Sequence, residues 1–310
     1  MKVAIATGDP AGIGPEISLK AARDPRVLEL CQPVLFGARD VLAMHGAVNG
    51  LQIVEVKQPR PRIGTVAPEH GRAALAAAEA AIRAALAGEY EAVIGAPHTE
   101  TAIHAAGIAF DGYPSFVARV CRLPADDAVL MLCFQHAGRE VRIAHVTLHV
   151  SVAQALRLIT RQRIVHTLRA VNDALVKLGI AKPRIAVSGV NPHAGEAGAF
   201  GREEIELVDP AIQEARGAGI VADGPIGADT LIQRAGYDAY VVMLHDQGHV
   251  AAKLLAPQRV AALTIGTPVL FSSVAHGSAL DIAGQGKANP DAMVEAITRL
   301  VGRRRRDIAT

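Results

Sequence analysis

The sequence has few of the features that mark exported, membrane-bound or nucleic-acid-binding proteins. It contains only 3 cysteines, and its 32 basic side chains nearly balance its 30 acidic ones. The balanced charge gives no general electrostatic attraction to nucleic acid or to a membrane surface. An odd number of cysteines at unrelated spacings argues against a disulfide framework and against a closed cysteine zinc site. We therefore expect a reducing, cytoplasmic environment.

Long hydrophobic runs are also missing. Gly, Pro or a charged residue interrupts every apolar stretch before it reaches about 18 residues, the length needed to span a bilayer. The first residues form a short apolar run that leads directly into a Gly-Asp-Pro turn, without the long core and cleavage site of an export signal. These absences predict a soluble protein whose partner is a small molecule.

What the sequence does contain is a regular alternation of short apolar runs with longer helical patterns. The chain has 310 residues, 50% of them hydrophobic, which is more than one compact domain usually holds. Helical patterns cover residues 70–89 and 162–179, and the second ends at Gly179, which suits a left-handed helix cap. Strand-like runs cover residues 2–7, 33–37, 51–56, 92–97, 128–133, 141–146, 184–189, 240–245 and 261–266. The alternation predicts an α/β fold with parallel strands in two closely associated domains.

A glycine-rich segment, Gly-Asp-Pro-Ala-Gly-Ile-Gly-Pro-Glu, occupies residues 8–16 between the first predicted strand and a helix. Ligands of parallel α/β proteins collect at the carboxyl ends of strands, and N–H groups at the start of the next helix can face an anion. Gly12 and Gly14 are therefore candidate cofactor-binding residues. The segment is not the G-x-G-x-x-G fingerprint, and a purely structural turn is an equally good interpretation.

Three of the 12 histidines, His149, His193 and His245, each end or follow a predicted strand. The ends of strands in one sheet converge, and three neutral imidazoles can hold Zn²⁺ or a related ion while leaving positions open for substrate. Their spacing matches no local zinc motif. From the residues alone, a structural role is therefore the stronger interpretation.

A loop rich in Gly, Ala and Ser follows at residues 276–289 and carries one acidic side chain, Asp281. A carboxylate in such a loop suits the recognition of ribose hydroxyls. The loop resembles the adenosine-binding loop of isocitrate and isopropylmalate dehydrogenases, which oxidise a β-hydroxy acid that then decarboxylates. This resemblance implies that Asp281 holds the adenosine ribose of NAD. It also implies that the adenine is surrounded by His276, Gly277, Ser278 and Asn289.

Taken together, the motifs are similar to the 4-hydroxythreonine-4-phosphate dehydrogenase family over nearly the whole chain. Besides the two glycine-rich segments, they include Asn-Pro-His-Ala-Gly-Glu at 191–196 and His-Asp-Gln-Gly at 245–248. The resemblance implies two α/β/α domains flanking a cleft, as in isocitrate and isopropylmalate dehydrogenases. We expect residues 1–125 and 262–310 to form the domain with the NAD-binding loop, and residues 126–261 to carry the metal ligands and dimer contacts.

The same resemblance assigns roles to individual side chains. It makes His149, His193 and His245 the ligands of one divalent metal ion, with zinc as the first choice and magnesium, manganese or cobalt as alternatives. The resemblance also implies a homodimer in which the ligands come from both subunits and the active sites are shared across the interface. Lys253 becomes a catalytic, substrate-contacting lysine. Asp246 is either a proton acceptor or a support for the neighbouring ligand.

The chain departs from the family where that family binds the phosphorylated substrate. The family's Gly-His-Thr-Glu reads Gly-Tyr-Pro-Ser at residues 112–115, an asparagine is replaced by Ala262, and an arginine by Phe271. A phosphate would lose an arginine and several hydrogen bonds through these changes. The altered segments resemble the terephthalate dihydrodiol dehydrogenase branch, which oxidises 1,2-dihydroxy-3,5-cyclohexadiene-1,4-dicarboxylate.

That branch makes His98, Tyr113 and Lys253 candidates for contacts to the substrate's hydroxyl and carboxylate groups. Core packing of Tyr113 and a surface role for His98 remain equally open. The sequence thus predicts a metal-dependent NAD oxidoreductase that oxidises and decarboxylates the dihydrodiol to protocatechuate. The alternatives are dehydrogenation of 4-hydroxythreonine 4-phosphate, dehydrogenation of a threonate or erythronate 4-phosphate, and a non-catalytic binding protein of the same fold.

Overall fold

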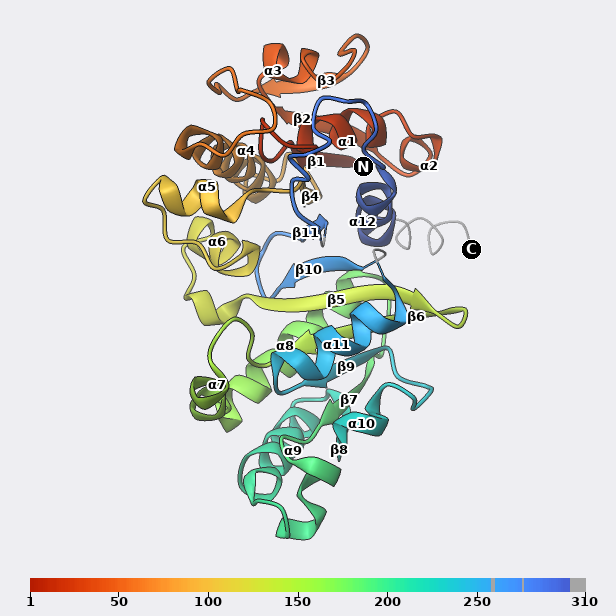
Figure 1. Cartoon of the computed structure of the whole chain (residues 1–310). Coiled ribbons are helices and arrows are strands. Elements are labelled where there is room, and N and C mark those ends of the chain that lie inside the picture. The colour runs from red at the N-terminus through yellow and green to blue at the C-terminus, as the bar shows by residue number, and fades with distance from the viewer. Residues whose placement is uncertain (258–259, 275, 302–310) are drawn as a thin grey trace. The chain divides into compact units, whose positions relative to one another are not determined.

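The computed structural model describes residues 1–257, 260–274 and 276–301, and Figure 1 shows the course of the chain. The chain forms two compact units. Unit 1 comprises Met1–Asp126 and Ala261–Thr310, and unit 2 comprises Asp127–Val260. Each unit has a β-sheet with helices packed on it, so the predicted α/β fold is confirmed. Among the described residues, no helix is both long enough and apolar enough to cross a membrane.

The sheet of unit 1 has the strand order β3-β2-β1-β4-β11-β10. Neighbouring strands run parallel except for β10 and β11, which pair antiparallel. The core of β1 and β4 is fully apolar because helices cover both faces of these strands. The strands are β1 (Lys2–Ala6), β2 (Gln32–Gly37), β3 (Gln52–Glu55), β4 (Ala92–Gly95), β10 (Ala261–Ile265) and β11 (Phe271–Val274).

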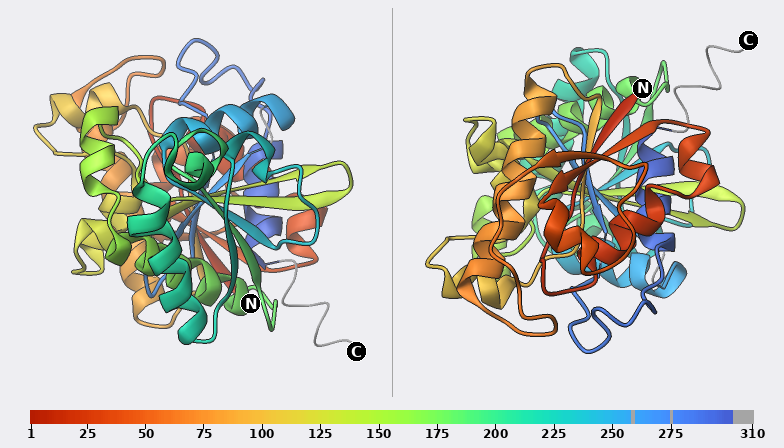
Figure 2. Two further views of the ribbon diagram at one scale, coloured as in Figure 1. Left: turned by 90° about the horizontal axis from the view of Figure 1, so that it is seen from below. Right: turned by 90° about the horizontal axis from the view of Figure 1, so that it is seen from above.

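The helices of unit 1 lie on both sides of this sheet. Figure 2 shows α4 along one side and α1 with α12 along the other, and both α4 and α12 contact β4. The helices are α1 (Gly14–Ala21), α2 (Pro25–Leu28), α3 (Arg39–Ala43), α4 (Pro68–Leu86), α5 (Glu100–Ala105), α6 (Tyr113–Val120) and α12 (Asp291–Val301), with a short 3₁₀ turn, η1, at Ala125–Asp127.

The sheet of unit 2 has the order β5-β6-β9-β7-β8. Strands β6, β9, β7 and β8 run parallel, and β5 pairs antiparallel with β6. The strands are β5 (Val129–His136), β6 (Arg139–His145), β7 (Arg184–Ser188), β8 (Val221–Ile226) and β9 (Ala239–Val242).

The helices α8 and α11 contact the same three strands of unit 2, β5, β6 and β9, from opposite faces (Figure 1). Helix α9 lies beside α8. The helical segments are α7 (Val152–Leu158), α8 (Arg161–Lys177), η2 (Pro192–Gly198), η3 (Glu204–Val208), α9 (Asp209–Gly217), α10 (Ala228–Leu231) and α11 (His245–Leu255).

The nine strand-like runs of the sequence all correspond to strands, and the two helical patterns correspond to α4 and α8. Gly179 has φ 90° after α8, as expected for its cap. Most neighbouring strands run parallel as the alternation predicted, whereas the pairs β5–β6 and β10–β11 are antiparallel. Ala137 and Gly138 join β5 to β6 with φ values of 48° and 75°, the backbone of a two-residue hairpin turn.

The sequence also missed β8 and β11. Strand β8 contains Gly224-Pro225, and its proline is tolerated because β8 is the edge strand of its sheet. Strand β11 has only 4 residues, and two of them are serines, so its apolar pattern is too short to recognise.

Gly71 tests how closely α4 packs on α5. A Cβ at this position would lie 2.5 Å from backbone atoms of Ala102, so the two helices would have to separate. We expect Gly71→Ala to lower the free energy of unfolding by about 1–3 kcal/mol despite the better helix propensity of alanine. In Gly217→Ala nothing lies within 4 Å of the new Cβ, and this control should gain about 0.5–1 kcal/mol. Urea unfolding followed by circular dichroism measures both, and a stabilised Gly71→Ala would contradict the packing.

Candidate functional site

The three predicted metal ligands of unit 2 follow neighbouring parallel strands. Strand β9 lies between β6 and β7 and is parallel to both, so their carboxyl ends lie at one edge of the sheet. His149 comes shortly after β6, His193 after β7, and His245 is the first residue of α11 after β9. The structure therefore has the strand arrangement on which the prediction of these histidines was based.

Four histidines at this edge form what we call the histidine cluster: His145, His149, His245 and His249. The rings of His245 and His249 stack with centroids 3.8 Å apart and an interplanar angle of 9°. The centroids of His149 and His245 are 5.6 Å apart. A hydrogen bond of 3.2 Å joins His249 Nδ1 to His145 Nε2. His245 and His249 are four residues apart on α11 and therefore lie on one face of that helix.

Two residues of the His-Asp-Gln-Gly motif explain this close packing. At Gly248, a Cβ would collide with the ring of His145, so only glycine lets α11 lie against β6. The Oε1 atom of Gln247 accepts from the backbone N–H groups of Met243 and Leu244 at 2.9 and 3.0 Å. Its Nε2 donates to the carbonyl of Gly189 at 3.1 Å. Gln247 thereby caps α11 and ties it to the segment that leads to His193.

Burial keeps part of the histidine cluster neutral. It lowers the pKa of His145 to about 3, with a further contribution from the charge of His249. Burial likewise lowers the pKa of His249 to about 4, and the charge of His245 adds to the effect. A neutral imidazole is the form that binds a metal ion. The Nδ1–H of His245 donates to the exposed carboxylate of Asp246 at 2.7 Å, a bond that fixes the orientation of the ring.

His193 lies in an unusual turn. Residues 193–197 all have positive φ, between 42° and 79°, and only Gly195 among them is a glycine. The buried carboxylate of Glu204 supports the turn by accepting from the N–H groups of Val190 and Asn191 at 2.7 and 2.8 Å. Left-handed backbone at non-glycine residues is strained and is common at functional sites. No pattern in the sequence indicates this conformation.

The structure brings His149 and His245 together but does not complete the predicted ligand set. Within the described residues, no group of three or more His, Cys, Asp or Glu side chains is placed to hold a metal ion. The donor chemistry nevertheless fits a divalent ion, because His149 and His193 are exposed imidazoles near strand ends. Lys253 is also exposed, one helical turn after His249 on α11.

In unit 1 the two glycine-rich segments pack against each other. The buried Ser278 accepts the N–H of Ile13 at its carbonyl, at 2.9 Å. Its hydroxyl hydrogen-bonds that of Thr99 at 2.9 Å, and Thr99 also donates to the buried carboxylate of Asp9. A Cβ at Gly12 would collide with Ser278. The sequence singled out both segments but did not show that they touch.

Several of the predicted cofactor residues have packing or capping roles in this structure. Gly12 is needed for the approach to Ser278, and Gly14 for the approach to the carbonyl of Thr7. The side-chain oxygen of Asn289 accepts from the N–H of Asp291 at 2.8 Å and so caps α12. In contrast, His276, Gly277 and Asp281 are exposed, with the Asp281 carboxylate at the surface of the loop. Cofactor contacts by these residues stay predictions.

The predicted substrate residues His98 and Tyr113 lie just beyond β4 in an aromatic group. Tyr113 is 5% exposed, and its hydroxyl donates to the carbonyl of Ala96 at 3.1 Å. Burial raises the pKa of this hydroxyl. The Tyr113 ring packs on Phe271 with centroids 4.7 Å apart, and on His98 at 4.8 Å. Tyr113 is thus part of the core of unit 1, with its hydroxyl already bonded.

His98 is less enclosed than Tyr113. Its ring is partly exposed and contacts Phe110 edge-on at a centroid distance of 4.8 Å. The Nδ1 atom is buried and has no hydrogen-bond partner among the described residues. Burial lowers the pKa of the ring. The exposed part of this neutral ring can contact a small polar ligand.

Solved structures define the class of this fold. A β-decarboxylating dehydrogenase from Thermococcus kodakarensis matches with a TM-score of 0.56 and 18% identity, over 97% of this chain and 83% of that one. At this identity the likeness concerns the fold alone. The chain therefore has the α/β fold of the β-decarboxylating dehydrogenases, as the sequence predicted.

The comparisons also define the family. The family described as pyridoxal phosphate biosynthetic protein PdxA matches residues 21–300. A 1,2-dihydroxy-3,5-cyclohexadiene-1,4-dicarboxylate dehydrogenase from Comamonas sp is 43% identical over 309 residues, 96% of each chain. The chain belongs to the PdxA family and is a dehydrogenase of that family.

Two solved structures in the family resemble this chain along nearly its whole length. A terephthalate 1,2-cis-dihydrodioldehydrogenase from Burkholderia xenovorans LB400 is 42% identical with a TM-score of 0.75, over 97% of this chain and 98% of that one. A 4-hydroxythreonine-4-phosphate dehydrogenase from Klebsiella pneumoniae is 32% identical with a TM-score of 0.84, over 97% and 99%.

The partly buried ring of His98 predicts a pH-dependent contribution to stability. Because its folded-state pKa lies below the value of 6.5 in the unfolded chain, the unfolded state binds more protons at acidic pH. Stability from this residue is present above pH 6.5 and is lost as the pH falls toward the folded-state pKa.

We expect His98→Phe, which keeps the ring contacts, to lose less stability than the unchanged protein between about pH 7.5 and about pH 5.5. Urea unfolding at both pH values measures the difference. His104→Phe, at an exposed position on α5, is the control and should behave as the unchanged protein. An identical pH dependence in His98→Phe would show that His98 is not held neutral by burial.

Proposed function

We propose that the protein is a metal-dependent NAD oxidoreductase that converts 1,2-dihydroxy-3,5-cyclohexadiene-1,4-dicarboxylate to protocatechuate. The secondary alcohol β to a carboxylate gives a hydride to NAD⁺ and a proton to a base, and the resulting keto acid loses CO₂ to become aromatic. The names of two relatives at 43% and 42% identity support this substrate. We further propose a cytoplasmic location.

The observation that carries the choice of substrate is the packing of Phe271 under Tyr113. Phe271 stands where the phosphate-binding branch has an arginine, and it is 0% exposed. Gly95 lies beneath both rings, and a Cβ there would touch each of them at about 2.8–2.9 Å. The position therefore presents no cation to a phosphate. An apolar aromatic core at this place supports a substrate that carries no phosphate.

On this proposal His149, His193 and His245 hold the divalent ion, with zinc as the first choice. When bound, the ion acts as a Lewis acid toward the substrate's carbonyl oxygen during loss of CO₂. Asp246 orients His245 through its 2.7 Å hydrogen bond. Lys253 is the candidate for contact with the substrate and for moving a proton, since it shares a face of α11 with His249. His98 is a second candidate contact.

The loop at residues 276–289 is the proposed site of the adenosine half of NAD. The exposed Asp281 carboxylate can accept hydrogen bonds from ribose hydroxyls and would repel the 2′-phosphate of NADP. This charge supports NAD over NADP as the cofactor.

We also propose that the protein acts as a homodimer whose active sites are shared between subunits. Large apolar side chains near the histidine cluster support this proposal. They are exposed to solvent in the single chain, and exposed apolar patches often mark protein–protein interfaces. They lie after β6, on α7 and on α11: Val150, Val152, Leu156, Val250 and Leu254, with exposed fractions from 36% to 77%. A second copy that covered this surface could also supply the third histidine.

A second candidate substrate is 4-hydroxythreonine 4-phosphate. The Klebsiella pneumoniae enzyme with that name has the higher TM-score, 0.84 against 0.75 for the dihydrodiol dehydrogenase structure. A threonate or erythronate 4-phosphate belongs to the same alternative. All of these substrates carry a phosphate, and the aromatic packing at Phe271 argues against each of them for the same physical reason.

The two candidate substrates can be compared directly. We expect the purified protein with NAD and a divalent metal to oxidise the cyclic dihydrodiol with a kcat/KM at least about 100-fold above that for 4-hydroxythreonine 4-phosphate, because a site without phosphate ligands rejects the charged group. NADH absorbance measures both rates, and chromatography identifies protocatechuate. Faster turnover of the phosphorylated substrate would instead identify the protein as a 4-hydroxythreonine-4-phosphate dehydrogenase.

Removing single histidines tests the metal site. Because His149 and His193 are exposed, His149→Ala and His193→Ala should fold normally but lose bound metal and nearly all activity. Elemental analysis, turnover and thermal unfolding are measured on the same samples. His104→Ala, at an exposed position outside unit 2, should keep metal and activity. Full metal occupancy with normal turnover in His193→Ala would remove this histidine from the site.

A further inference from the structure

The loop at residues 276–289 is tied to α1 and to the turn before it at two separate places. The first tie is Ser278, which bonds Ile13 and packs on Gly12 near the beginning of the loop. The second tie is near its end and comes from Glu16 and Lys20, which form an ion pair of 2.7 Å on one face of α1. Neither of these two residues is explained by the proposed function.

The second tie consists of three hydrogen bonds to the loop backbone. Glu16 Oε1 accepts from the N–H of Ala288 at 2.8 Å. The Lys20 ammonium donates to the carbonyls of Gly286 and Ala288 at 2.9 and 2.7 Å. With its bond to Glu16, the ammonium uses all three of its donors, so its geometry is fully determined.

Glu16 is held in this place at a cost. It is 1% exposed, and its Oε2 atom has no hydrogen-bond partner among the described residues. A buried carboxylate is unfavourable unless it is paired and hydrogen-bonded. The ion pair with Lys20 lies within α1, whereas the bond from Ala288 offsets part of that cost only while the loop keeps its conformation. This bond therefore favours one arrangement of the loop over others.

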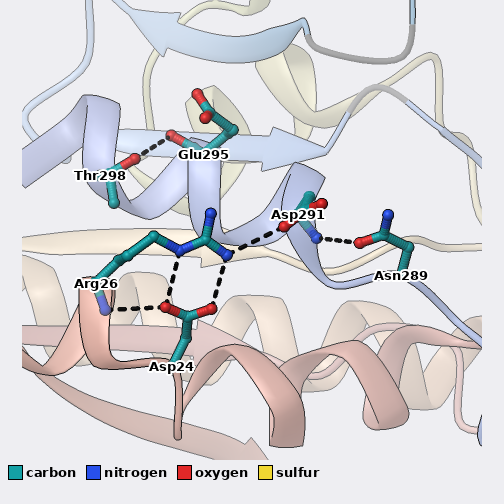
Figure 3. A network of polar contacts seen from close by, with 6 residues as sticks. All are labelled: Asp24, Arg26, Asn289, Asp291, Glu295 and Thr298. Carbon is teal, nitrogen blue, oxygen red and sulfur yellow. Dashed lines mark hydrogen bonds and ion pairs between the residues drawn. The ribbon is translucent and has the colours of Figure 1, made fainter.

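A third contact beyond the loop does not replace this tie. Figure 3 shows Arg26, beside Asp24, reaching Asp291 at 3.1 Å where α12 begins. Both side chains of that bond are more than half exposed, with fractions of 55% and 61%. Exposed ion pairs contribute little. The buried Glu16 and the fully bonded Lys20 are the stronger constraint on the end of the loop.

Between its two ties the loop contains Gly284, which has a φ of 72°, and the exposed Asp281. A glycine-containing loop that becomes ordered only on binding loses conformational entropy at that moment, and its affinity falls accordingly. Ties that are already formed in the absence of ligand remove much of this loss.

We propose that Glu16 and Lys20 are positioning residues for the nicotinamide cofactor. They hold residues 276–288 in the conformation that receives the adenosine half of NAD, without touching the cofactor themselves. This inference rests on the proposed function, because it takes that loop to be the cofactor site. Loss of either side chain weakens cofactor binding and leaves the chemistry at the histidine cluster unchanged.

The test compares two basic residues near the end of α1, Lys20 and Arg23, whose side chains bond to different segments. Lys20→Met removes the tie to the loop. Arg23→Met is the matched control: Arg23 donates to the carbonyls of Leu19, Ala47 and Asn49 at 3.2, 2.8 and 3.2 Å, so it makes the same kind of bond to the segment before β3. Titration calorimetry with the full chain measures the Kd for NAD in each variant.

We expect Lys20→Met to bind NAD roughly tenfold more weakly, which corresponds to about 1.4 kcal/mol, and Arg23→Met to bind as the unchanged protein. Lys20→Arg keeps a cation that can reach the same carbonyls and should recover most of the affinity. In turnover, Lys20→Met should raise the KM for NAD while kcat, the KM for the dihydroxy acid and the metal content stay unchanged. A merely structural role would not produce this split.

Hydrogen exchange gives a second readout. Amides of residues 276–288 should exchange faster in Lys20→Met than in the unchanged protein, and saturating NAD should restore their protection. If Lys20→Met does not fold, Glu16→Gln takes its place, because an amide still accepts from Ala288 but no longer pairs with the ammonium. It should also weaken NAD binding.

The outcomes separate this inference from the proposed function. An unchanged protein that does not bind NAD overturns the proposed function, and the inference with it. Normal NAD binding with an equal Kd in Lys20→Met overturns the inference alone. An equal loss of affinity in Arg23→Met also overturns it, since the effect would then come from general destabilisation of α1.

Discussion

The close approach of Gly12 to Ser278 is the contact on which the candidate cofactor side of the protein depends. It brings together two segments that lie far apart in the sequence. Lys20 and Glu16 then form side-chain bonds to the end of the same loop, across sequence separations of 266 and 272 residues. A side chain at position 12 would force the loop away, because a Cβ already overlaps Ser278. The glycine-rich segment therefore acts first as a packing surface, and any contact to a ligand is built on that packing.

Unit 2 uses the same device for its histidines. Gly248 has no side chain, so α11 lies directly against the ring of His145, and the His245 and His249 rings stack on the helix face beside it. The burial that results keeps the pKa of His145 and of His249 low. Imidazoles kept neutral in this way cannot repel a divalent cation, whereas protonated ones would. In both units a glycine thus allows a close contact: Gly12 lets the turn before α1 approach Ser278, and Gly248 lets α11 approach His145.

How much of this could be predicted depends on how local each feature is. Strands covered on both faces are continuous apolar runs, so β1 and β4 were visible in the sequence, while the edge strand β8, with its proline, was not. The strand-end positions of His149 and His245 followed from the same pattern. The left-handed turn at His193 and the burial of Tyr113 depend on Glu204 and Phe271, partners that no local pattern reveals. For the same reason, no local pattern reveals that Gly12 packs against Ser278.

The contrast between Phe271 and the histidines bears on how substrate preference changes within this family. On the proposed function the metal-binding and cofactor residues are retained, and the difference lies in the core of unit 1. An arginine introduced at Phe271 alone would bury a charge below the Tyr113 ring with no partner, which is strongly unfavourable. Tyr113 and Phe271 therefore have to change together, because each ring fills the space that the other leaves above Gly95. A preference that depends on such a coupled pair resists single substitutions, so a chain with this aromatic packing is separated from the phosphate-binding branch by at least two simultaneous changes.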